Sequence, residues 1–69
     1  MDSLAQDLRA RRKQLGLRQR ELADLAGTSE RFIRELEHGK PSVRLDKVAA
    51  VLDVLGLELR AERRVGASP

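Results

Sequence analysis

The sequence predicts an all-α fold, a compact bundle of four short helices, with a single β-strand added at its C-terminal end. Apolar residues recur every three or four positions through most of the chain, which is the period of amphipathic helices. Glycines interrupt this pattern and divide it into segments, at Gly16, Gly27, Gly39 and Gly56. After Gly56 the apolar residues alternate with charged ones, which is the period of a half-buried strand.

The first two helices are separated by the break Gly16-Leu17. The first is predicted from Ser3 to this break, with an apolar face of Leu4, Leu8 and Leu15. The second follows Arg18, and its apolar stripe comprises Leu22, Ala23, Leu25 and Ala26. Gly27 favours the left-handed conformation that ends it.

The third helix is predicted to run from the cap residue Ser29 to about His38. Glu30 then lies in the first turn, where the helix dipole favours an acid. On a helical wheel one arc is apolar, with Phe32, Ile33 and Leu36. The opposite arc is charged or polar, with Glu30, Arg31, Arg34, Glu35 and His38.

The fourth helix and the strand follow a loop over residues 39–42, where Pro41 prevents helix continuation. The apolar face of this helix comprises Leu45, Val48, Ala49, Leu52 and Leu55. In the strand, the apolar positions are Leu57, Leu59 and Ala61. Because one strand cannot satisfy its own backbone, we expect it to pair with the same strand of a second copy across a twofold axis. Residues 1–56 then form the helical domain, residues 57–64 the dimerising strand and residues 65–69 a flexible tail.

The composition restricts what the chain can do. Its 69 residues form one domain at most, and a chain this short buries only about 60% of the surface that it exposes when unfolded. It has no cysteine and one histidine, and it is too short for a preformed pocket of a few hundred cubic ångströms. We therefore expect no enzyme, no metal site and no cofactor.

The net charge and the hydropathy of the chain indicate which kinds of partner it can bind. The formal net charge of +3 favours acidic partners, and a single aromatic residue, Phe32, argues against single-strand binding by base stacking. No segment approaches the roughly 18 apolar residues that a membrane span requires, and the N-terminus resembles no signal peptide. We expect a cytoplasmic chain without membrane contact.

The outer arc of the third helix carries groups that suit double-stranded DNA. Arg31 and Arg34 are forked donors one turn apart, and with Glu30 they can address guanine, cytosine N4 and phosphate oxygens in a major groove. The alternative is a solvated face with Arg–Glu pairs. The two short helices around "LAGTS" favour DNA, because such a pair forms the helix-turn-helix unit.

Residues 15–40, "LGLRQRELADLAGTSERFIRELEHGK", resemble the helix-turn-helix of the Xre family, the class of Cro and the phage repressors. The shared positions are Gln19, Leu22, Ala23, Gly27, Ser29, Ile33, Leu36, Glu37 and Gly39. The resemblance implies base contacts from Ser29, Glu30 and Arg31, and Arg34, a longer donor on the same face, is expected to read bases beside Arg31. The resemblance also implies a structural ion pair between Arg12 and Glu37.

Phosphate contacts are expected from Arg18, Gln19 and Lys40. Arg18 departs from the family, where a capping residue is common, and Arg34 stands where many relatives have Ser. Ser29 has the alternative of a cap alone, and phosphates would repel Glu30 unless it accepts from cytosine or orients an arginine. The basic residues Arg9 and Lys13 suit either a phosphate surface or a solvated face.

Residues 40–62, "KPSVRLDKVAAVLDVLGLELRAE", resemble the helix-then-strand ending of HipB-type antitoxins. This resemblance implies a homodimeric repressor that binds a palindromic operator, autoregulates its operon and neutralises a toxin encoded beside it, such as a HipA-like kinase. A stand-alone or phage-type Xre regulator without a toxin is the alternative, and a protein-interaction module that has lost DNA binding is another.

Overall fold

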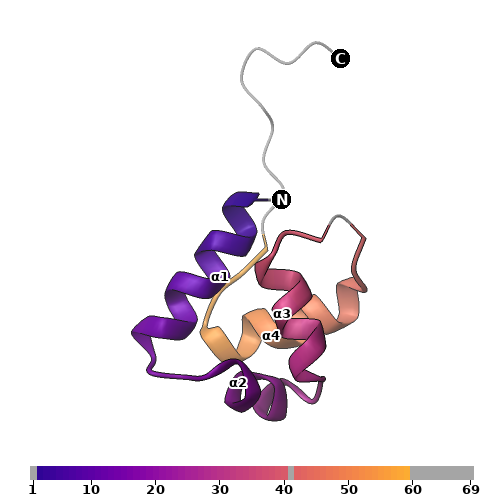
Figure 1. Ribbon diagram of the computed structural model, residues 1–69. Coiled ribbons are helices and arrows are strands. Elements are labelled where there is room, and N and C mark those ends of the chain that lie inside the picture. The colour runs from indigo at the N-terminus through magenta and orange to yellow at the C-terminus, as the bar shows by residue number, and fades with distance from the viewer. Residues whose placement is uncertain (1, 41, 60–69) are drawn as a thin grey trace.

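The computed structural model describes residues 2–40 and 42–59, and this part of the chain contains four α-helices and no β-strand. The helices are α1 (Asp2–Gln14), α2 (Gln19–Ala26), α3 (Glu30–Glu37) and α4 (Leu45–Leu55). The predicted bundle of four short helices is confirmed, and each helix lies in a segment bounded by the glycines (Figure 1). Within the described residues, none of the helices is long and apolar enough to cross a membrane.

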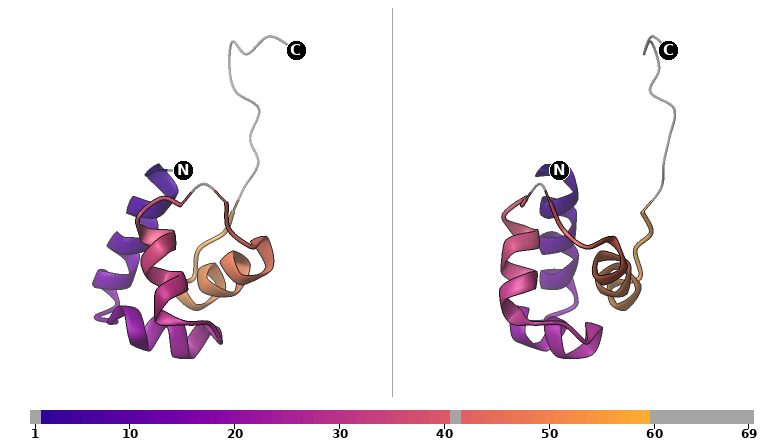
Figure 2. Two further views of the ribbon diagram at one scale, coloured as in Figure 1. Left: turned by 45° about the vertical axis from the view of Figure 1, so that its right-hand side comes forward. Right: turned by 90° about the vertical axis from the view of Figure 1, so that its right-hand side faces the viewer.

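The arrangement of the helices leaves one face of α3 open. Helices α1 and α3 run side by side in opposite directions, and α2 crosses the end where α1 stops and α3 starts (Figure 2). Helix α4 packs against α1 and α2. Since α3 contacts α1 and α2, these two helices cover its inner face.

The core receives aliphatic side chains from all four helices. Its buried members are Leu8, Leu22, Ala23, Ile33, Leu36, Val48, Val51, Leu52 and Leu55. Burial of one such large side chain stabilises the fold by about 1.5–3 kcal/mol. This packing matters most for α2 and α3, because helices of 8 residues are too short to be stable alone.

Three leucines that the sequence places on apolar faces are exposed in the structure, and these assignments are wrong: Leu15, Leu25 and Leu45. Leu15 follows the last residue of α1, and Leu45 is the first residue of α4, so both project past the core. Leu25 lies roughly 160° from buried Ala23 on a helical wheel. Ala49 is also exposed, and the buried face of α4 instead includes Val51.

The segment after α4 begins as a cap and continues along the surface. Gly56 has a φ of 69°, and Leu57 N donates to the carbonyl oxygen of Leu52 at 2.9 Å. Leu57 packs against the core, whereas Leu59 is exposed. In this single chain residues 57–59 form no strand. Ala61, the rest of the predicted strand and the tail over residues 65–69 lie outside the described residues, so the dimerising strand stays a prediction.

Candidate nucleic-acid interface

The turn between α2 and α3 sets the direction of α3. Gly27 adopts a φ of 69°, which disfavours side chains with a Cβ, and Thr28 N donates to the carbonyl oxygen of Ala23 at 2.9 Å. Ser29 Oγ then accepts from Phe32 N at 3.0 Å, which caps the first turn of α3. The structure therefore assigns Ser29 a capping role, and Ser29 is an exposed residue.

The inner face of α3 fixes which side chains point outward. Ile33 and Leu36 are buried in the core, and Phe32 is half-buried, with Lys47 Nζ 5.7 Å from the centre of its ring. A one-residue rotation of the helix would bring Arg34 inward and expose Ile33. The hydrophobic core therefore holds the charged side outward.

The outer face of α3 carries the two arginines that the sequence singled out. Arg31 is 83% exposed and Arg34 is 54% exposed. Each faces an acid one turn away: Arg31 Nε lies 3.9 Å from Glu35 Oε2, and Arg34 Nη2 lies 3.9 Å from Glu30 Oε2. These distances are too long for hydrogen bonds, so neither arginine is firmly fixed. A new partner can displace both pairs at small cost.

Helix α2 begins with a cap that the sequence did not predict. Glu21 Oε1 accepts from Arg18 N at 2.9 Å, so the acid in the first turn reaches back to the residue that precedes the helix. The missing signal was the spacing Arg18-x-x-Glu21, because an arginine hides a capping pattern that usually starts with Ser or Thr. The Arg18 side chain is exposed at this helix end.

Arg12 and Glu37 form a buried ion pair between α1 and α3. Arg12 Nε donates to Glu37 Oε2 at 2.6 Å, and Nη2 donates to Oε1 at 3.0 Å. Their side chains are only 10% and 4% exposed. Arg12 Nη1 also donates to the carbonyl oxygen of Leu17 at 2.9 Å, and Gln19 Nε2 donates to Glu37 Oε1 at 3.2 Å. The network joins α1, the start of α2 and the end of α3.

A small polar cavity of about 130 Å³ lies over this network, lined by Arg9, Arg12, Gln19, Glu37 and His38. His38 Nδ1 donates to the carbonyl oxygen of Arg34 at 2.6 Å, which places a proton on Nδ1. Gln19, expected at a phosphate, thus lies beside the exposed Arg9. Both side chains line this cavity together with Glu37 and His38 at the C-terminal end of α3.

Lys40 and Arg44 lie past the end of α3 and both contact acids. Lys40 Nζ donates to Glu35 Oε2 at 3.2 Å. Arg44 donates to both carboxylate oxygens of Asp46, at 3.2 Å and 2.7 Å, and these hydrogen bonds lower the pKa of Asp46 below its ordinary value. Lys40 therefore belongs to the charged surface of α3, whereas Arg44 pairs within its own segment.

Arg11 has a structural role that the sequence did not reveal. Its Nε donates to the carbonyl oxygen of Leu55 at 2.9 Å, which satisfies an otherwise unpaired group at the end of α4. No local pattern predicts this contact, because the two residues are 44 positions apart in the sequence. Of the basic cluster on α1, Arg11 and Arg12 are used inside the fold, and Arg9 and Lys13 are exposed.

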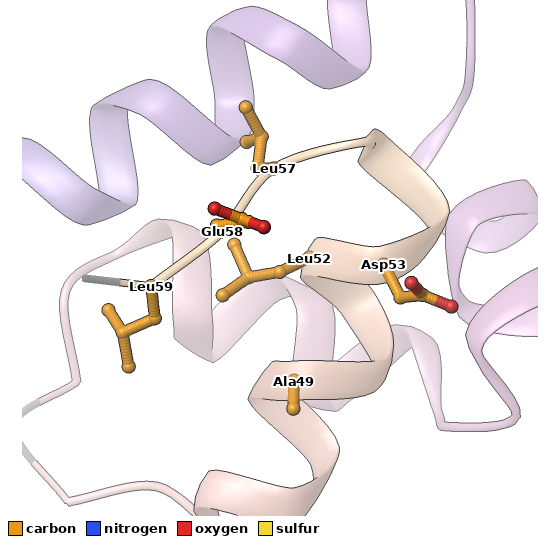
Figure 3. Close-up of a pocket in the computed structure, with 6 residues that line it drawn as sticks. All are labelled: Ala49, Leu52, Asp53, Leu57, Glu58 and Leu59. Atoms are coloured by element: carbon orange, nitrogen blue, oxygen red, sulfur yellow. The ribbon is translucent and has the colours of Figure 1, made fainter.

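A larger groove of about 460 Å³ lies on α4 and the segment after it, away from the residues expected at DNA. It is lined by Ala49, Leu52, Asp53, Leu57, Glu58 and Leu59 (Figure 3). The groove is lined by aliphatic side chains and by the carboxylates of Asp53 and Glu58.

Two short helices joined by a tight turn, with the second exposing a charged face, define a helix-turn-helix domain. A helix-turn-helix family model (HTH_3) matches residues 8–61, so the chain belongs to this family, as the resemblance to Xre-type proteins predicts. The chain is also 50% identical, over 48 residues or 70% of its length, to a Sinorhizobium fredii (strain NBRC 101917 / NGR234) protein named "Uncharacterized HTH-type transcriptional regulator y4mF". The match covers 63% of that relative.

Proposed function

We propose that this protein is a sequence-specific DNA-binding regulator of transcription that inserts α3 into the major groove. One observation carries the proposal: Arg31 and Arg34 project from an α3 whose opposite side is locked into the core. Forked guanidinium groups on a rigid helix suit the acceptor edges of guanine. Family membership and the name of the S. fredii relative support the same function.

The proposed contacts divide into two groups. Base edges are contacted by Ser29, Glu30, Arg31 and Arg34, which lie in or directly before the first turns of α3. Phosphates are contacted by Arg18, Gln19 and Lys40, at the start of α2 and after α3. Contacts of the second group position the protein, and contacts of the first group specify the sequence.

Binding to duplexes across a salt series tests this function. Selection from a randomised duplex library should enrich one sequence, and its affinity should fall steeply with salt, by about 0.9 in log–log slope for each neutralised phosphate. A protein that enriches no sequence, or that shows a flat slope, does not act as proposed.

We infer further that the protein binds a palindromic operator as a homodimer, through a strand over residues 57–64 that pairs with its copy. The alternating residues Leu57, Leu59 and Ala61 support this inference. Deletion of residues 57–69 should yield a monomer in sedimentation experiments. A truncated chain that still sediments as a dimer would exclude this interface.

The finer proposal is that the regulator is the HipB-like antitoxin of a type II toxin–antitoxin pair and represses its own operon. The resemblance of residues 40–62 to HipB-type antitoxins supports it. A toxin bound on surfaces other than α3, such as α1, α4 or the tail, would leave α3 available to DNA. Co-expression with the adjacent open reading frame tests it: a product that co-purifies and is toxic alone supports the antitoxin, and a product that does neither leaves the stand-alone regulator.

A further inference from the structure

The outer surface of α3 is not simply cationic. It carries three basic side chains, Arg31, Arg34 and Lys40, and two carboxylates, Glu30 and Glu35, which lie within 4 Å of them. If phosphate attraction alone governed binding, acids here would only weaken it, because each phosphate contact depends on an uncompensated cation. Besides their pairing within the helix, the two acids can therefore influence which DNA the surface binds.

Glu35 is the more restrained of the two acids. Its side chain is 33% exposed, and its Oε2 atom is shared by Lys40 Nζ at 3.2 Å and Arg31 Nε at 3.9 Å. The backbone adds a further tie, since Lys40 N donates to the carbonyl oxygen of Glu35 at 3.1 Å. Glu35 thus lies between Arg31 and Lys40, two basic side chains that are proposed to contact DNA, and its carboxylate offsets part of their positive charge.

The atoms involved distinguish Arg31 from Arg34. Glu35 approaches Arg31 at Nε, and the two terminal nitrogens stay available for an end-on contact with O6 and N7 of one guanine. Glu30 approaches Arg34 at Nη2, one of the two terminal nitrogens that such a contact needs. An end-on base contact by Arg31 therefore leaves free the nitrogen nearest its acid, whereas the same contact by Arg34 uses the nitrogen nearest its acid.

We propose that Glu35 is a positioning residue that sets the sequence specificity of the DNA contact, an inference that rests on the proposed function. At the operator, Arg31 binds guanine end-on and its Nε remains beside Glu35. On other sequences Arg31 reaches for a phosphate and leaves Glu35, whose carboxylate then faces the DNA backbone with less compensation. Repulsion between the Glu35 carboxylate and the phosphates therefore weakens binding to arbitrary DNA more than binding to the operator.

Replacement of the charge tests the proposal. Glu35→Gln should raise the affinity for sheared random-sequence duplex by roughly tenfold, because one repulsive charge is removed near phosphates. The affinity for the duplex selected by the wild-type protein should change by less than about threefold, since the loss of Arg31 positioning offsets the gain. The ratio of the two affinities should therefore fall, and circular dichroism should show unchanged helix content.

Asp53→Asn is the matched control, because it removes one exposed carboxylate from α4, away from α3. Both affinities should rise together in this variant and leave their ratio unchanged. Glu35→Asp keeps the charge but shortens the side chain, so it should keep weak binding to random duplex while it relaxes the preference at one base position.

The results of these experiments distinguish a failure of the proposed role of Glu35 from a failure of the proposed DNA-binding function. Equal changes of the ratio in Glu35→Gln and Asp53→Asn would overturn the role of Glu35 and leave DNA binding intact. A wild-type base preference in Glu35→Asp would overturn the positioning of Arg31. A wild-type protein that enriches no duplex would overturn the proposed function itself, and the inference with it.

Discussion

Helix α3 takes part in arginine–glutamate pairs of two kinds. At its C-terminal end, Glu37 accepts two hydrogen bonds from Arg12, at 2.6 Å and 3.0 Å. Both side chains of this pair are buried. On its outer face, Arg31 and Arg34 lie 3.9 Å from Glu35 and Glu30, and both arginines are exposed. The same two residue types thus occur in opposite environments.

The difference shows that burial, rather than residue type, decides what an ion pair does in this domain. The Arg12–Glu37 pair is bidentate and joins two helices, so its geometry is fixed and its loss strands a buried charge. The outer pairs lie within one helix, and such pairs contribute only about 0.2–0.5 kcal/mol each. The first pair holds α3 in place, and the others leave its charges available to a ligand.

The largest effect is expected from Glu37→Ala. It leaves the Arg12 guanidinium buried without its acid, which should lower the free energy of unfolding by about 3–5 kcal/mol. A loss of that size approaches the total stability of a small domain. Urea denaturation followed by circular dichroism measures it.

The double variant Arg12→Met with Glu37→Leu is the control for this prediction. Apolar residues of similar volume leave no charge stranded, so much of the lost stability should return. If Glu37→Ala costs less than about 1 kcal/mol, the buried pair behaves like an exposed one and the contrast between the two kinds fails.

The next largest effect concerns DNA rather than folding. Arg34→Ala should weaken operator binding by about 1–3 kcal/mol and relax the preference at one base position, with little change in the free energy of unfolding. Titration of the selected duplex, compared with its single-base variants, measures both effects.

Arg34→Lys separates base contact from simple charge. Lysine keeps the positive charge but lacks the planar fork, so random duplex should bind as before while the preference at that base position is relaxed. Equal losses on operator and random duplex in Arg34→Ala would instead make Arg34 a phosphate contact.

An intermediate effect is expected at Ser29, which caps the helix on which the outer pairs lie. Ser29→Ala removes the acceptor of Phe32 N and should lower the free energy of unfolding by about 1 kcal/mol. Ser29→Asp supplies another capping oxygen and should restore it. If Ser29→Asp restores stability and operator affinity alike, the cap accounts for the role of Ser29 and a base contact is not needed.

Much of the fold follows from local features of the sequence. The helix breaks at Gly27 and Gly56 and the apolar arc of α3 depend on conformational preference and on spacing along one helix, so the sequence predicts them. The outward position of Arg31 and Arg34 follows from that arc, because Ile33 and Leu36 must face inward.

Contacts between helices could not be predicted in the same way. Arg11 appears as one of several basic residues on α1 until α4 places the carbonyl group of Leu55 beside it. Leu25 is exposed because α3 and α4 contact another side of α2, which no periodicity within eight residues can reveal. The partner of Arg12 was found only through resemblance to a known family, since spacing alone does not connect it with Glu37.

The smallest effect is expected from Glu30→Gln, which removes the outer acid that faces Arg34. The pair is long and exposed, so its loss should lower the free energy of unfolding by no more than about 0.5 kcal/mol, and added salt should remove even this difference. Urea denaturation at low and high salt measures it, with Glu37→Ala as the buried counterpart. A salt-independent cost above about 2 kcal/mol would show that the outer pair also holds the fold together, and its arginine would then not be available to DNA without partial unfolding of α3.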